Sequence, residues 1–173
     1  TRSFDKMTDD IEILKERIST FSFKCAEKLR AQGCCCNHVT VFLTTNYFRG
    51  DLKQYSKSIS ITLPNPSSSA IELNKYALKA LDAIYQEGYL YKKAGVLVSS
   101  FVPDTERITS LFDYDYHKKH VPVMKVIDQL NKRLGADKLK LASMDVQRTW
   151  KMQQKNLSKR YSTDIRQVIE IKV

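Results

Sequence analysis

Glycine and proline are scarce in this sequence, and no long apolar run interrupts it. Five glycines and four prolines among 173 residues are too few for a collagen-like chain. The sequence contains no run of about 18 apolar residues, the length needed to cross a bilayer. We therefore expect no membrane partner. With 42% hydrophobic residues, the chain is not wholly disordered and can build a core. Its length fits one or at most two compact domains.

Cysteine is confined to Cys25 and the triplet 34–36, with His38 just behind. Three consecutive residues cannot easily direct three thiolates at one tetrahedral ion, and no second pair with metal-ligand spacing follows. We therefore interpret the cysteines as buried or loop thiols and expect no metal site. The first ten residues are polar and do not resemble a signal peptide, so we expect a reducing, cytoplasmic location. The absence of an initiator Met at Thr1 suggests a fragment of a longer protein.

Positive charge is in excess. The 29 Lys and Arg against 19 Asp and Glu give a formal net charge of +10. Such an excess favours a polyanionic partner, although a merely basic surface would have the same composition.

Two segments have helical periodicity. From Ile11 to Leu29 apolar residues recur every three or four positions, with Thr8 as the expected N-cap and Gly33 as the end of the helix. Ser69 and Glu72 have the spacing of a capping box and predict the start of a second helix.

Three other segments alternate apolar and polar side chains, as half-buried strands do: 38–46, 57–63 and 89–100. A loop is expected at 64–66. If residues 2–4 form a short first strand, the order is β-α-β-β-α-β, the split βαβ plan. The predicted fold class is therefore α+β, with a four-stranded sheet and two helices on one of its faces.

After Pro103 the pattern changes. Residues 104–119 are interpreted as an exposed linear segment in which His117 and His120 are solvated. A third helix is expected to begin at Val121 or Pro122, with Pro at its start. Its expected core stripe has helical spacing: Val123, Ile127, Leu130 and Leu134.

The chain is accordingly divided into residues 1–103, a linker at 104–119, and a smaller α/β extension at 120–173. A strand at 138–142 is expected in the extension, and the basic tail that starts at Met144 has no assignable periodicity.

Catalytic signatures are missing. The chain has no glycine-rich phosphate loop and no nucleophile placed beside a base, and helix capping explains Asp9 and Asp10. We expect the chain to be catalytically inert on its own.

The uncovered sheet face is the better candidate site, because hydroxyls and cations bind phosphate oxygens without reading sequence. Any one-sided antiparallel sheet also presents polar residues to water, so this bland interpretation stays open. Only Phe42 is placed to stack a base, which disfavours single-stranded RNA. The polar residues expected on the face alternate with the core residues: Ser3, Thr40, Thr44, Ser58, Ser60, Thr62 and Lys93.

Particular residues closely resemble the C-terminal part of the UmuC-type Y-family translesion DNA polymerases, the type that is the catalytic subunit of bacterial DNA polymerase V. Residues 2 to about 100 resemble the little finger domain of that family. The residues that carry the likeness follow in chain order: Arg2-Ser3-Phe4, Ala26 to Arg30, His38 to Phe48, Ala80 to Tyr85, Tyr91 to Val96, Trp150-Lys151-Met152, Leu157-Ser158 and Tyr161-Ser162-Thr163.

The resemblance implies that the open sheet lies along the DNA backbones. Relatives can have a Lys at the position of Thr44, so this chain would have one cation fewer on the open face. The palm carboxylates that bind Mg²⁺ in this family have no counterpart here, so no cofactor is expected in this chain and Mg²⁺ is expected only for the polymerase core. The expected DNA-backbone contacts combine the sheet face and the resemblance: Arg2, Ser3, Thr40, Thr44, Ser60, Lys92 and Lys93.

A sliding-clamp peptide, typically Gln-Leu-x-Leu-Phe, follows the little finger in this family. Ile108-Thr109-Ser110-Leu111-Phe112 corresponds to it. Leu111 and Phe112 match the pattern, whereas Ile108 and Thr109 depart from it, so weaker clamp binding is expected. An alternative is that Leu111 and Phe112 pack back onto the protein.

These inferences predict a non-catalytic DNA grip and clamp tether in the SOS response. The expected partners are primer-template DNA, the processivity clamp and, by resemblance, the UmuD′ dimer and RecA. Two alternatives are a protein-interaction scaffold with incidental DNA contact and an autonomous enzyme.

Overall fold

The computed structural model describes residues 1–112, 114–135, 137–144, 157–161 and 163–167. Its elements, in chain order, are β1 (Arg2–Thr8), α1 (Ile11–Ala31), β2 (Cys34–Thr45), β3 (Ser56–Ser67), α2 (Ala70–Ile84), β4 (Tyr91–Pro103), the short 3-10 helix η1 (Asp104–Glu106), α3 (Tyr116–Leu134) and a second 3-10 helix, η2 (Ile165–Gln167).

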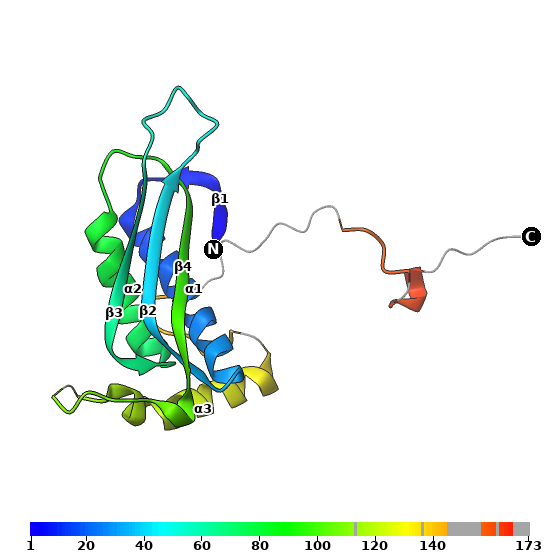
Figure 1. The fold of residues 1–173 in the computed structure, drawn as a ribbon. Helices are drawn as coiled ribbons and strands as arrows, with labels where there is room; N and C mark the ends of the chain where they lie inside the picture. The colour runs from blue at the N-terminus through cyan, green and yellow to red at the C-terminus, as the bar shows by residue number, and fades with distance from the viewer. Residues whose placement is uncertain (113, 136, 145–156, 162, 168–173) are drawn as a thin grey trace, which may run out of the picture.

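The four strands form one antiparallel sheet in the order β1-β4-β2-β3. Helices α1 and α2 pack on one face of the sheet, the other face is turned toward the viewer in Figure 1, and α3 lies across one end. The predicted α+β class is confirmed. Within the described residues, no helix is long and apolar enough to span a membrane.

The core lies between the sheet and the two helices because each element has one apolar side. Val39, Val41 and Leu43 alternate along β2 and are fully buried, as period-2 strand geometry requires. Leu14 and Ile18 of α1 meet them from the helix layer.

Several strand boundaries differ from the prediction. β1 extends to Thr8, and β2 begins at Cys34 instead of His38. Residues 64–66, expected as a loop, belong to β3. This strand is an edge of the sheet, where a proline that cannot donate a ladder hydrogen bond is tolerated.

The helix caps are partly as expected. Asp10, not Thr8, caps α1, and its side chain accepts a hydrogen bond from the Glu12 amide. Ser69 caps α2 as predicted. The Glu72 carboxylate accepts from the Ser67 hydroxyl at 2.5 Å, so the reciprocal half of the capping box is replaced by a contact with β3.

Helix α3 differs most from the prediction. It begins at Tyr116, so Pro122 lies inside the helix, and it ends at Gly135, whose φ of 106° favours glycine. No strand forms at 138–142, all of which is described.

The face that α3 turns inward also differs. Its buried residues are His117, Met124 and Asn131, whereas Val123 and Leu134 of the expected stripe are 50% and 58% exposed. The Asn131 side chain exchanges hydrogen bonds with the backbone of Leu139. A buried polar residue with such partners is as compatible with the interior as an apolar one.

Candidate functional site

The open sheet face consists of cross-strand rows set by the register. Ser3 of β1, Lys93 of β4, Thr44 of β2 and Ser56 of β3 form one row, and Leu97, Thr40 and Ser60 form another. The structure thus brings five of the predicted DNA-contact residues onto one face: Ser3, Thr40, Thr44, Ser60 and Lys93.

Hydroxyls on this face are partly paired with each other. Thr40 donates to Ser60 across the strands at 3.0 Å, and Thr62 lies 3.1 Å from Nδ1 of His38. These groups remain accessible to solvent, so their free lone pairs and hydrogens can meet a ligand. No carboxylate occurs at any residue in the printed register of β2, β3 and β4, all of which is described.

Phe42 lies flat in the middle of the face because its cross-strand neighbour is Gly95. A Cβ built on Gly95 would come within 2.4 Å of the Phe42 ring. The Lys93 ammonium stands 5.9 Å from the centroid of the same ring, within cation–π range. Gly95 therefore keeps the surface flat, and the ring helps to place the cation.

Lys92 is engaged elsewhere. A β-bulge falls at this residue, because Thr44 pairs with Lys93 whereas Thr45 pairs with Tyr91. The Lys92 ammonium donates to the backbone carbonyls of Phe4 and Asp5 in β1, at 2.5 and 3.4 Å. It binds the edge strand instead of projecting from the open face. Arg2 is exposed at the start of β1, opposite Ala94.

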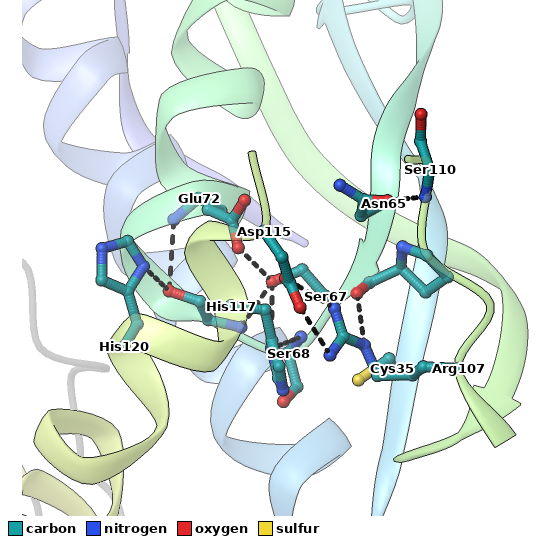
Figure 2. Close-up of polar contacts among 12 residues, drawn as sticks. Cys35, Asn65, Ser67, Ser68, Glu72, Arg107, Ser110, Asp115, His117 and His120 are labelled. Atoms are coloured by element: carbon teal, nitrogen blue, oxygen red, sulfur yellow. Dashed lines mark hydrogen bonds and ion pairs between the residues drawn. The ribbon is translucent and has the colours of Figure 1, made fainter. Parts of the chain in front are cut away.

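The expected clamp peptide is held at its base and exposed at its tip. Arg107 donates to the Pro66 carbonyl at 2.8 Å. The Ser110 amide donates to the Asn65 side chain at 2.6 Å, as Figure 2 shows. Leu111 and Phe112 are 96% and 98% exposed. The alternative in which they pack onto the protein is therefore wrong.

A polar cluster beneath this segment was missed at the sequence level (Figure 2). His117 is buried, and its Nδ1 accepts from the Ser68 amide at 3.2 Å. His120 Nδ1 lies 2.9 Å from the Ser69 hydroxyl. The expectation that both histidines are simply solvated is wrong for His117 and incomplete for His120. The only sequence signal was their spacing of three residues, which places both on one side of a helix.

Cys35, Asp104 and His117 converge closely enough to suggest a metal site. The hydrogen bonding disfavours it. Since the Ser68 amide donates to Nδ1, the proton of the neutral ring sits on Nε2, 3.2 Å from the Asp104 carboxylate, and is not free to make way for a metal. Burial, together with Asp104, raises the pKa of the Cys35 thiol to about 12. The group is better explained as an anchor for α3.

Comparison with known proteins identifies the fold's relatives. Residues 1–111 match the impB/mucB/samB family C-terminal domain, and residues 122–171 match a domain of unknown function, DUF4113. The chain is 29% identical to UmuC of Salmonella typhimurium over 173 residues, covering 99% of this chain and 41% of UmuC. It is 31% identical to Salmonella typhimurium ImpB, covering 97% of this chain and 40% of ImpB.

The chain thus spans about two fifths of the length of these relatives. Trp150, Lys151, Met152 and Ser162, which contributed to the resemblance, lie outside the described residues. The match through residues 1–111 nevertheless extends over most of the chain. The resemblance to the C-terminal part of UmuC-type proteins is confirmed, and the chain belongs to the impB/mucB/samB family through its C-terminal domain.

Proposed function

We propose that this chain is the non-catalytic DNA-binding and clamp-tethering part of an error-prone translesion DNA polymerase that acts in SOS-type damage tolerance. The observation that carries the proposal is the open sheet face, on which hydroxyls and Lys93 gather without a carboxylate in the paired rows. In this proposal, catalysis belongs to the portion of the relatives that the chain does not match, and the protein acts in the cytoplasm.

Double-stranded primer-template DNA is the ligand that fits this face. Hydroxyls from three strands and the Lys93 ammonium can donate to phosphate oxygens, and such contacts fix a duplex without reading its bases. A net charge of +10 adds long-range attraction that salt screens. Ser3, Thr40, Thr44 and Ser60 are the proposed contacts beside Lys93, with Arg2 at the margin.

The test is a fluorescence titration of a blunt duplex at several salt concentrations. Lys93→Ala should weaken binding about equally for different sequences and lower the slope of log affinity against log salt by about one. Lys79→Ala is the matched control, because Lys79 is exposed on α2 in the opposite layer. Duplex binding that is insensitive to salt and to Lys93→Ala would refute the grip.

Lys92 is excluded from that test for a structural reason. Its ammonium binds carbonyls of β1, so Lys92→Ala would disturb the edge strand as well as remove a cation. We propose that Lys92 contributes to DNA binding mainly by holding β1, and with it Ser3, in place.

The second half of the proposal is a tether to the processivity clamp. Leu111 and Phe112 project into solvent from a segment that Arg107 and Ser110 anchor to β3, so they can enter an apolar pocket without unfolding the domain. Ile108 is also largely exposed. It and Thr109 and Ser110 complete the proposed clamp-binding peptide.

A clamp pull-down tests the tether. Leu111→Ala with Phe112→Ala should abolish capture of the clamp, because these two side chains are the almost completely exposed apolar groups that would enter the apolar pocket of the clamp. Tyr114→Ala is the control for loss of an exposed ring nearby, since Tyr114 is 65% exposed. Unchanged capture by the double variant would place the clamp contact elsewhere.

One observation favours the scaffold alternative. Val123 and Val126 on α3 are about half exposed, which suits a protein partner such as a UmuD′-like dimer or RecA. Replacing both with Ser should leave duplex binding unchanged and weaken capture of such a partner. If the duplex is not bound at low salt while the partner is, the scaffold replaces the DNA grip.

A further inference from the structure

The connection between β2 and β3 extends past the end of the sheet (Figure 1) and is built by its own side chains. We call residues 46–54 the hairpin tip. The two N–H groups of the Gln54 side chain are shared among three backbone carbonyls of the hairpin tip, those of Asn46 at 3.2 Å, Arg49 at 2.7 Å and Leu52 at 3.1 Å. Hydrogen bonds within the hairpin tip therefore define its shape, and contacts with the core helices are not needed for this.

The base of the hairpin tip is fastened in the same way. The Thr45 hydroxyl donates to the side-chain oxygen of Gln54, Oε1, at 3.0 Å. Asn46 closes a turn, because its side chain accepts from the Phe48 amide at 3.2 Å and its carbonyl accepts from the Arg49 amide at 3.0 Å. These bonds hold the backbone on both sides of Tyr47.

What the hairpin tip presents is a pair of aromatic rings. Tyr47 and Phe48 are 86% and 93% exposed. Their ring centroids are 6.1 Å apart at an interplanar angle of 83°, an edge-to-face contact. Since burying aromatic surface is among the largest sources of stability, two adjacent rings held in water by an ordered loop indicate a ligand with apolar faces.

Position and charge decide which ligand. The hairpin tip directly follows the row of Thr44 and Ser56, so it continues the open face. Arg49 is paired with Asp51 inside the hairpin tip, so the cation of the tip that has no carboxylate beside it in sequence or in this pair is Lys53, and the open face itself adds Lys93. Aromatic rings beside cations are the combination that binds unpaired nucleotides, because the rings stack on bases while cations attract phosphates.

We propose that Tyr47 and Phe48 form a stacking site for unpaired DNA bases that continue from the duplex held on the open face. The site deepens the proposed function and rests on it. Base faces inside a duplex are covered by their neighbours, so the rings act only where the DNA is single-stranded, at a primer-template overhang. The duplex grip and the stacking site thus make separate contributions to affinity.

The experiment compares two probes on the full chain: a blunt duplex and the same duplex with a single-stranded 5′ overhang. Tyr47→Ala with Phe48→Ala should weaken binding of the overhang probe at least about fivefold, the effect of losing one stacked base, and leave the blunt duplex unchanged. The matched control exchanges the rings, Tyr47→Phe with Phe48→Tyr. It keeps both faces and should bind both probes like the wild type.

Two outcomes would overturn the stacking site. Overhang binding that is unchanged in the alanine variant would leave the rings to an apolar pocket of a protein partner. An equal loss for both probes would make the hairpin tip a duplex contact. Neither outcome is confused with failure of the grip, which is read from the response of the blunt duplex to Lys93→Ala.

Discussion

Gly95 shows how one missing side chain shapes the surface. Its backbone lies beneath the Phe42 ring, with Thr1 as the other close neighbour. Any side chain at position 95 would displace the Phe42 ring, which is the cation–π partner of Lys93. The strand needs a glycine here for space, since its φ is not positive.

Gly95→Ala should lower the free energy of unfolding by about 1 kcal/mol, because the new methyl group forces Phe42 to turn away. The cost should shrink in a Phe42→Ala background, where no ring occupies the space. Urea denaturation of the four proteins of this double-mutant cycle measures the coupling. Equal costs in both backgrounds would show that the ring does not lie over Gly95.

At the scale of elements, α3 is attached by polar contacts more than by apolar burial. Arg30 of α1 makes a two-bond ion pair with Asp128, at 2.6 and 2.7 Å, and donates to the Ser68 carbonyl at 2.8 Å. Arg107 pairs with Asp115 at 3.0 Å. Met124 is the apolar residue of α3 that is fully buried.

Asp128→Ala should lower the free energy of unfolding by about 1–3 kcal/mol, because it leaves the poorly exposed Arg30 guanidinium without its carboxylate. Asp51→Ala is the matched control. Arg49 holds the pKa of Asp51 at about 2, but water screens this exposed pair and its loss should change stability little. Thermal or urea unfolding compares the two variants, and similar losses would contradict the argument.

His117 makes the attachment of α3 sensitive to pH. Burial, and then Arg107, lower the pKa of His117, while Asp104 and Asp115 act in the opposite direction. Because the folded pKa lies below the ordinary histidine value of 6.5, the unfolded chain binds the proton more readily. The stability contribution is complete above about pH 6.5 and is lost as the pH falls toward the folded pKa.

Asn is the informative replacement for His117, because its side-chain oxygen can accept from the Ser68 amide but cannot titrate. The free energy of unfolding of wild type should fall between pH 7 and 5 more steeply than that of His117→Asn. Parallel pH profiles for wild type and His117→Asn would assign the sensitivity to other groups.

On the scale of the whole molecule, the sheet and its two helices form a core to which the remainder is added. Met124 and Met144 are the residues beyond Pro103 that join the buried core cluster among those described. The division at residues 103 and 119 stays a prediction, although α3 begins within the expected linker.

A chain ending at residue 112 provides the test. It should unfold cooperatively, because sheet and helices supply most of the core, but at a lower urea midpoint, because Arg30 and the Ser67–Ser69 segment lose their partners on α3. Circular dichroism during denaturation measures both properties. A molten or aggregated product would show that α3 is an integral part of the domain.

Much of the fold could be predicted because its signals are local. Period-2 alternation in 38–46 and helical spacing in 11–29 determine which side of each element is apolar. Elements with one apolar side can bury that side only by packing against each other in layers. The open face of the candidate site follows directly. The boundaries of β3 could not be predicted, since Pro64 and Pro66 are compatible with a strand only at a sheet edge, and strand order is not a local property.

The sequence by itself therefore determined the layered α+β fold, the polar face opposite the helices and the composition of the exposed peptide around Leu111. Only the tertiary structure decided that Lys92 binds the carbonyls of β1 and that His117 and Asn131 are buried. It also decided that Tyr47 and Phe48 are exposed on a hairpin tip held by its own hydrogen bonds. The physical reason is that a polar side chain can lie inside or outside at similar cost, depending on whether a distant segment supplies its hydrogen-bond partner.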